Sequence, residues 1–239
     1  MEKNIEGKTL ADLAAEKLMD LIREREYLPG DKLPTEAELS EWLKVGRNTV
    51  REAVRILVSR NIVTVRQGSG TFISEKQGVI DDPFGFSFMG DRGKLTRDLI
   101  QVRIMLEPPI AALAAQNATE EDLEELEKIL LEIESLIEKK EDYSQKDIQF
   151  HEQIANCTHN SVMSNLIPVI GKGVAVFASE VQQQEYEQTL ISHRIIFQAI
   201  KEGRGVEAQQ AMHFHLLYNE NRYLEEQEGA VLQETEKSP

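Results

Sequence analysis

Residues 29–67 read PGDKLPTEAELSEWLKVGRNTVREAVRILVSRNIVTVRQ, and GSGTFI follows directly at residues 68–73. Thr35 precedes a helical pattern and Glu38 stands three residues later, which predicts a capping box at the start of a helix. After a turn at residues 44–46, apolar residues recur every three or four positions, which predicts a second helix. The stretch therefore encodes two short helices separated by a tight turn.

The second of these helices has two faces of different chemistry. Its apolar positions share one face and should be buried: Val50, Ala53, Val54, Leu57 and Val58. The rest of its surface carries Arg47, Asn48, Thr49, Arg51 and Arg55. Arginine pairs bidentately with guanine and also holds phosphates, so this exposed face is suited to the major groove of double-stranded DNA.

The segments on either side of these two helices predict a further helix upstream and a β-hairpin downstream. Upstream, apolar residues from Leu10 to Ile22 recur at helical spacing, and Pro29-Gly30 ends the pattern. Downstream, residues 62–65 and 71–73 are β-prone, and the glycines between them permit a tight hairpin that can approach a phosphate backbone. Three helices followed by this hairpin predict a winged helix-turn-helix DNA-binding domain over residues 1–74.

The charge distribution supports this interpretation. The chain has a net charge of −15, which by itself repels nucleic acid. Residues 1–74, however, carry 12 basic and 12 acidic side chains, and residues 44–66 carry six basic side chains against Glu52 alone. Positive charge is thus concentrated on the element predicted to contact DNA.

The segments LPTEAELSE, VGRNTVREAVRIL and VRQGSGTFI resemble the DNA-binding domain of the GntR family of bacterial transcription regulators over about residues 8–74. The resemblance implies DNA contacts by Arg47, Arg51, Thr49 and Gly68. Ala37 and Gly46 depart from the family pattern, which has an arginine and a hydroxyl residue at these positions, so the operator sequence is not implied. The predicted DNA-binding residues are Arg47, Asn48, Thr49, Arg51, Arg55, Gln67 and Gly68.

The remainder of the chain predicts a second, all-α domain. Residues 75–93 contain glycine, proline and three phenylalanines, which indicates a partly docked linker. Over residues 94–230, helical patterns dominate, and an antiparallel α-helical bundle is the economical packing. Pro108-Pro109 should kink or split the first of these helices. The fold class is therefore mainly α, with helices expected near 94–117, 119–140, 144–157, 161–183, 186–202 and 205–227.

Four polar residues of this domain fall on apolar helical faces: Asp147, His151, His193 and His215. Burying them is costly unless they share a partner, and a divalent cation is one such partner. Three imidazoles and a carboxylate suit a borderline metal, zinc first, with nickel and manganese as alternatives. A histidine-containing core without metal remains the other interpretation of the residues themselves.

A second resemblance bears on this choice. RIMLEPPIAALAA, DIQFHEQIANCTHN and HRIIFQAIKEGRGVEAQQAMHFH are similar to the FCD effector domain of the FadR-type branch of the GntR family, over residues 94–227. The resemblance implies that Asp147, His151, His193 and His215 ligate a metal ion. It also implies that a small organic acid completes the coordination and that Arg103 faces it.

Together these features predict a homodimeric repressor, not an enzyme, that binds an operator and responds to a small carboxylate. A metalloenzyme fused to a DNA-binding domain, and a metal-free ligand-responsive regulator, are the two alternatives. No apolar signal core or membrane-spanning run is present, so a cytoplasmic location without membrane association is expected.

Overall fold

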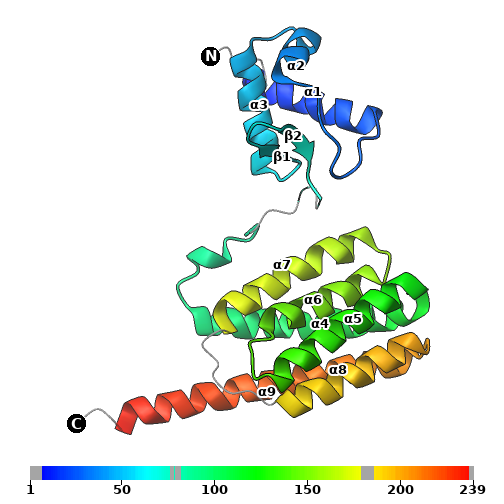
Figure 1. Ribbon diagram of the computed structural model, residues 1–239. Coiled ribbons are helices and arrows are strands. Elements are labelled where there is room, and N and C mark those ends of the chain that lie inside the picture. Colours follow the sequence, from blue (N-terminus) through cyan, green and yellow to red (C-terminus); the bar gives the residue numbers. More distant parts are fainter. Residues whose placement is uncertain (1–6, 76–77, 79–81, 179–185, 237–239) are drawn as a thin grey trace. The chain divides into compact units, whose positions relative to one another are not determined.

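The computed structural model describes residues 7–75, 78, 82–178 and 186–236. The chain divides into two compact units, residues 1–83 and 84–239 (Figure 1). The first is the small N-terminal unit with the only strands described, and the second is built from helices. The predicted fold class, a winged helix-turn-helix followed by a helical domain, is confirmed.

The N-terminal unit is built on three helices, α1 (Leu10–Glu24), α2 (Glu36–Leu43) and α3 (Arg47–Ser59). Thr35 caps α2, and Glu38 returns a carboxylate to the Thr35 backbone N–H at 2.7 Å, so the predicted capping box is present. Gly46 caps α3 without a side-chain hydrogen bond. Leu18, Val50 and Leu57 are fully buried where α1 packs on α3.

Two apolar residues that belong to the expected helical patterns of this unit lie outside the core. Val58 was expected in the buried face of α3 but is 41% exposed, and Leu10 at the start of α1 is 52% exposed. Both lie near the end of a helix, where the core no longer extends over them. The chain's one tryptophan, Trp42, is on α2 and is 46% exposed.

The wing is an antiparallel hairpin of β1 (Val63–Arg66) and β2 (Gly70–Ile73). Its register pairs Val63 with Ile73 and Arg66 with Gly70. Gly68 has a φ of +74°, a conformation in which other residues are strained, so the turn at 67–69 requires it. Val63 and Ile73 are buried and attach the hairpin to the helical core.

The second unit contains the six expected helices. They are α4 (Arg92–Asn117), α5 (Glu120–Glu138), α6 (Ser144–Asn156), α7 (Ser161–Ala178), α8 (Tyr186–Lys201) and α9 (Gly205–Glu236). Helix α4 contacts α6, α7, α8 and α9 and is therefore the central element (Figure 1). The end predicted for α7, up to residue 183, lies outside the described residues. None of the described helices has an apolar stretch long enough to cross a membrane.

Of the two outcomes expected at Pro108-Pro109, a kink or a split of the first helix, the split does not occur. Helix α4 continues through both prolines to Asn117. Proline lacks the N–H that would bond to the carbonyl four residues earlier, so two helical hydrogen bonds are lost here. Burial compensates for this loss, because Glu107, Pro108, Ile110 and Ala111 all lie inside the unit.

The phenylalanine segment is partly docked, as the sequence indicates. Residues Phe86–Phe88 form a short 3-10 helix, and Phe86 packs against the core of the helical unit. A side chain added at Gly173 would meet the Phe86 ring at 3.0 Å. Phe88, by contrast, is 92% exposed. This segment therefore belongs with the helical unit.

Candidate metal centre and DNA-binding surface

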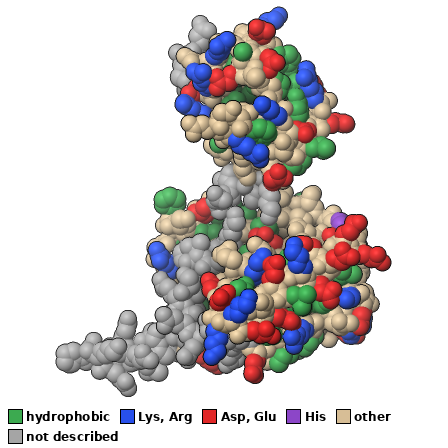
Figure 2. All heavy atoms as spheres, viewed as in Figure 1, with side chains coloured by type: hydrophobic (Ala, Val, Ile, Leu, Met, Phe, Trp, Pro, Cys, Tyr) green, Lys and Arg blue, Asp and Glu red, His purple; other side chains and the backbone are tan. Residues whose placement is uncertain are grey.

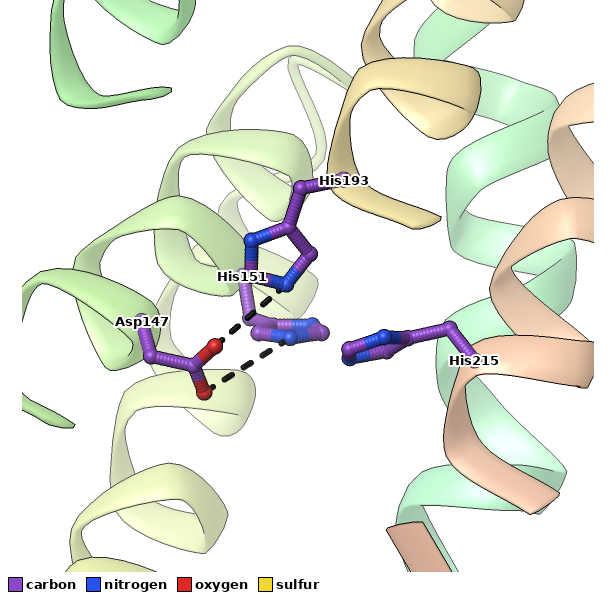
Figure 3. Close-up of side chains that lie close together, drawn as sticks. All are labelled: Asp147, His151, His193 and His215. Carbon is purple, nitrogen blue, oxygen red and sulfur yellow. Dashed lines mark ion pairs between the residues drawn. The ribbon is translucent and has the colours of Figure 1, made fainter. Parts of the chain in front are cut away.

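Four side chains from three helices converge inside the helical unit (Figure 3). Asp147 and His151 lie one turn apart on α6, His193 comes from α8 and His215 from α9. One ligand atom from each can be chosen so that all four lie within 4.8 Å of one another. The three histidines are buried and Asp147 is partly exposed. The four ligands predicted from the sequence are thus brought together.

The carboxylate of Asp147 faces two of the imidazoles. Its Oδ1 lies 3.3 Å from His193 Nε2, and its Oδ2 lies 4.0 Å from His151 Nε2 (Figure 3). Neither ring nitrogen of His151 or of His193 makes a well-formed hydrogen bond. Buried polar atoms left in this state are costly, and a shared cation would relieve the cost.

Glu107 of α4 adds a contact that the sequence analysis missed. Its Oε2 lies 2.6 Å from His151 Nδ1, although the angle is poor for a hydrogen bond. Its Oε1 accepts a hydrogen bond of 2.6 Å from Arg103 Nε. A carboxylate beside Nδ1 favours a proton on that atom, which leaves Nε2 of His151 free on the side of Asp147. The spacing of four between Arg103 and Glu107 was the available signal.

His215 is oriented by two further residues that were not predicted. The Ser192 hydroxyl donates to the Thr189 carbonyl at 2.9 Å, so its oxygen is free to accept from His215 Nδ1, also at 2.9 Å. Asn219 Nδ2, which can only donate, lies 3.2 Å from His215 Nε2. Both contacts select the same tautomer. The lone pair of His215 Nε2 can therefore bind a metal ion if the contact with Asn219 is given up.

Burial keeps His193 and His215 neutral. It lowers the pKa of His193 to about 4, even though Asp147 acts in the opposite direction. The pKa of His215 is also well below its ordinary value, because of burial and then the neighbouring His193 and His151. Burial alone would raise the pKa of Glu107, but Arg103 and His151 lower it to about 2. Neutral imidazoles beside ionised carboxylates are the protonation states that metal ligation requires.

The donor set fits a divalent metal. Three imidazole nitrogens and one carboxylate oxygen suit a borderline ion such as zinc. The four unsatisfied nitrogens of His151 and His193 are the structural observation behind this fit.

A separate cavity of about 490 Å³ lies elsewhere in the unit. It is lined by residues of α4 and α7 that include Leu106, Pro109 and Met163. Neither Arg103 nor any of the four candidate ligands lines it.

The remaining histidines lie apart from the centre. His159 bonds through Nε2 to Asp122 at 2.8 Å, and Asp122 also completes the capping box of α5 with Thr119. His213 is exposed on α9, two residues before His215. Neither of these two histidines therefore belongs to the candidate metal centre.

The predicted DNA-contacting residues lie on α3 and on the turn of the wing. Arg47, Asn48, Arg51 and Arg55 are exposed, and Thr49 is partly so. Arg51 Nε donates to Glu36 of α2 at 2.8 Å, and Arg55 pairs with Glu52 on its own helix. Gln67 and Gly68 are exposed at the tip of the hairpin. Acidic side chains gather over the visible face of the helical unit, whereas both signs alternate on the N-terminal unit (Figure 2).

Comparisons with known proteins assign both units. Residues 10–73 match the bacterial regulatory proteins of the gntR family, and residues 98–218 match the FCD domain. The galactonate operon transcriptional repressor of Escherichia coli is 32% identical over 77% of this chain and 84% of its own length. The Uxu operon regulator of Haemophilus influenzae is 36% identical over 80% of this chain and 73% of its own.

A solved structure agrees with these relatives. The Streptococcus agalactiae GntR structure has a TM-score of 0.78 and 42% sequence identity, and the alignment covers 88% of this chain and 99% of that one. These domains and relatives are transcription regulators and not enzymes, so the metalloenzyme alternative is set aside. The chain is a DNA-binding transcription regulator with an FCD effector-binding domain, and it belongs to the GntR family.

Proposed function

We propose that this regulator is a metal-containing repressor whose affinity for its operator is controlled by a small carboxylate. The observation that carries the proposal is the convergence of Asp147, His151, His193 and His215, in which the buried ring nitrogens of His151 and His193 make no well-formed hydrogen bond. We infer zinc, with nickel or manganese as alternatives, because the donor set is mixed nitrogen and oxygen. When bound, the ion supplies Lewis acidity that attracts the oxygens of an acid.

The acid is inferred from charge. Arg103 is buried, and Glu107 raises its pKa despite the burial, so it is a permanent cation inside the unit. Glu107 uses Nε and Nη2 of its guanidinium, at 2.6 and 3.4 Å. The remaining donors suit the carboxylate of a ligand. One relative is named for the galactonate operon, so sugar acids of that class are the first candidates.

The DNA side of the proposal rests on exposed cations. Arg47, Arg51 and Arg55 project from α3, and the wing turn presents Gln67 and Gly68. We infer a homodimer, because a helix-turn-helix protein of this kind reads two half-sites with two copies of α3. An acid that binds the DNA-competent and DNA-incompetent arrangements with different affinities shifts the balance between them, and we infer release of the operator.

Elemental analysis and operator titration test this proposal together. Protein purified without chelator should contain stoichiometric divalent metal, and galactonate or a related acid should weaken its binding to duplexes selected from a random library. Arg103→Lys should retain the charge beside Glu107 but lose the forked geometry, and with it the response to the acid. Absence of metal in the wild-type protein would contradict the metal centre, and a normal response by Arg103→Lys would exclude Arg103 from the acid site.

A further inference from the structure

The wing has a third extended segment beside its two strands. Leu33 N–H donates to the Thr71 carbonyl at 2.8 Å, and Ile73 N–H donates to the Asp31 carbonyl at 2.8 Å. Lys32 and Phe72 are therefore paired across an antiparallel bridge, and β2 lies between this segment and β1. Because side chains alternate along extended chains, the small sheet has two distinct faces.

The inner face of this sheet enters the core. Leu33, Val63 and Ile73 are all buried there. The opposite face carries Lys32, Phe72 and Arg66. Phe72 pairs with Thr64, and Arg66, two residues further along β1, is its diagonal neighbour on the same side. Lys32 and Arg66 are exposed, and Phe72 is partly buried between them.

The Phe72 ring contacts both cations. Lys32 Nζ lies 5.9 Å from the ring centroid, and Arg66 Cζ lies 4.6 Å from it. Both distances fall in the range in which an aromatic ring attracts a cation. The ring thus orients two positive groups that would otherwise repel each other and extend into solvent.

Glycine at position 70 makes this arrangement possible. A Cβ atom there would lie 2.8 Å from Lys32 Cε, which is closer than real contacts allow. Gly70 also has a φ of +118°, a conformation that L side chains rarely adopt. The Lys32 side chain therefore passes over the backbone at Gly70, beside Arg66, the strand partner of that glycine.

These two cations, unlike several others of the unit, have no acidic partner. Arg23 pairs with Asp20, Arg51 with Glu36 and Arg55 with Glu52. Among the described residues, no ion pair involves Lys32 or Arg66. Two adjacent positive charges that are oriented by a ring and lack a counter-charge form a site for an anion.

We propose that Lys32 and Arg66, held by Phe72, bind one phosphate group of the DNA backbone at the base of the wing. This Phe72 clamp rests on the proposed function, since it needs DNA beside the wing. The occupant is a backbone phosphate because Arg66 directly precedes the turn residues Gln67 and Gly68, which are proposed to meet the same DNA. The contact fixes the position of the wing and carries no sequence preference.

The salt dependence of DNA binding tests the clamp, because each phosphate contact releases counterions. Full-length wild type, Lys32→Ala and Arg66→Ala are titrated with one selected duplex over a salt series. Losing one phosphate contact should reduce the slope of log K against log salt by about 0.9 for each wing bound. Lys128→Ala, which removes an exposed cation from the helical unit, is the control for net charge and should keep the wild-type slope.

Conservative variants separate the clamp from a folding defect. Arg66→Lys should keep the salt slope, since a point charge still reaches the phosphate. Phe72→Leu should keep the slope but lower the affinity several-fold, because the cations remain without their orienting ring. If Lys32→Ala or Arg66→Ala melts early, Lys32→Gln and Arg66→Gln replace them in the titration.

The variant Arg47→Ala, which removes a cation from α3, shows whether a negative result concerns the clamp alone or the whole proposed DNA-binding surface. If Arg47→Ala reduces the slope while neither Lys32→Ala nor Arg66→Ala does so, the clamp is overturned and the α3 surface stands. If none of the three changes the slope, the proposed DNA-binding surface itself is overturned. Reduced slopes for the Lys32 and Arg66 variants, with the Lys128→Ala control unchanged, support the clamp.

Discussion

Single side chains connect separate helices at the candidate metal centre. Asp147 and His151 belong to α6, whereas His215 reaches them from α9. We predict that His215→Ala loses bound metal and melts at a lower temperature, because the remaining buried ligands lose their common partner. Metal content and thermal unfolding are measured side by side.

A matched control for this variant lies two residues away. His213 is exposed on the same helix, so His213→Ala should keep both metal and melting temperature. Full metal occupancy in His215→Ala would contradict the ligand assignment.

The buried pair of Arg103 and Glu107 gives a second prediction at this scale. Glu107→Gln leaves the Arg103 guanidinium buried without a negative partner, and breaking a buried pair in this way costs about 3–5 kcal/mol. Urea denaturation measures the loss. Glu125→Gln, which breaks the exposed pair with Lys128, should leave the midpoint nearly unchanged. Equal effects of the two variants would show that the buried pair has no special role.

The convergence of Asp147, His151, His193 and His215 could be predicted because helical periodicity places each of them on an apolar face of its own helix. The surrounding contacts could not be predicted in the same way. Glu107 reaches His151 from another helix, and Ser192 reaches His215 across 23 residues of chain. Such contacts depend on how the helices pack together, and the periodicity of one helix does not contain that information.

Helix ends offer a prediction at the scale of elements. Thr35 accepts a hydrogen bond from the Glu38 N–H and so satisfies one free donor at the start of α2. Thr35→Ala should destabilise the N-terminal unit by about 1 kcal/mol, whereas Thr35→Ser retains the hydroxyl and should cost much less. Thermal unfolding followed by tryptophan emission compares the two. Equal destabilisation would mean that the cap contributes little.

Some structural elements could be predicted from residues close together in the sequence, and others could not. The capping box at Thr35 and the glycine turn of the wing depend on residues close in sequence, so their patterns were sufficient. At Pro108-Pro109 the local pattern left a kink or a split open, and burial among four neighbouring helices offsets the lost hydrogen bonds and keeps α4 continuous. Val58 shows the same limit: periodicity finds the apolar face but not where the core ends.

At the scale of the whole molecule, acid should destabilise the metal-free protein. His193 has a pKa of about 4 when folded and about 6.5 when unfolded, so between these values the unfolded chain binds a proton that the folded chain does not. Stability is complete above about pH 6.5 and falls as the pH is lowered toward 4, by roughly 3 kcal/mol in total.

Chelator-treated protein is melted across this pH range to test the dependence. His193→Phe removes the titrating group while retaining a ring beside Phe150, which stacks on His193 at 4.4 Å between centroids. The variant should lose much of the pH dependence. A wild-type melting temperature that stays constant from pH 6.5 to 4 would contradict the prediction.

The position of Trp42 has a practical consequence for following this molecule. Since it is the only indole in the chain and lies half-exposed on α2, tryptophan emission, excited selectively so that the tyrosines do not contribute, reports on the N-terminal unit alone. Far-ultraviolet circular dichroism is dominated instead by the long helices α4 to α9. The two signals can be recorded on one unlabelled sample during a titration with metal or acid. A change in tryptophan emission when metal or acid is added would then show that binding in the helical unit alters the N-terminal unit. This measurement requires no knowledge of the operator.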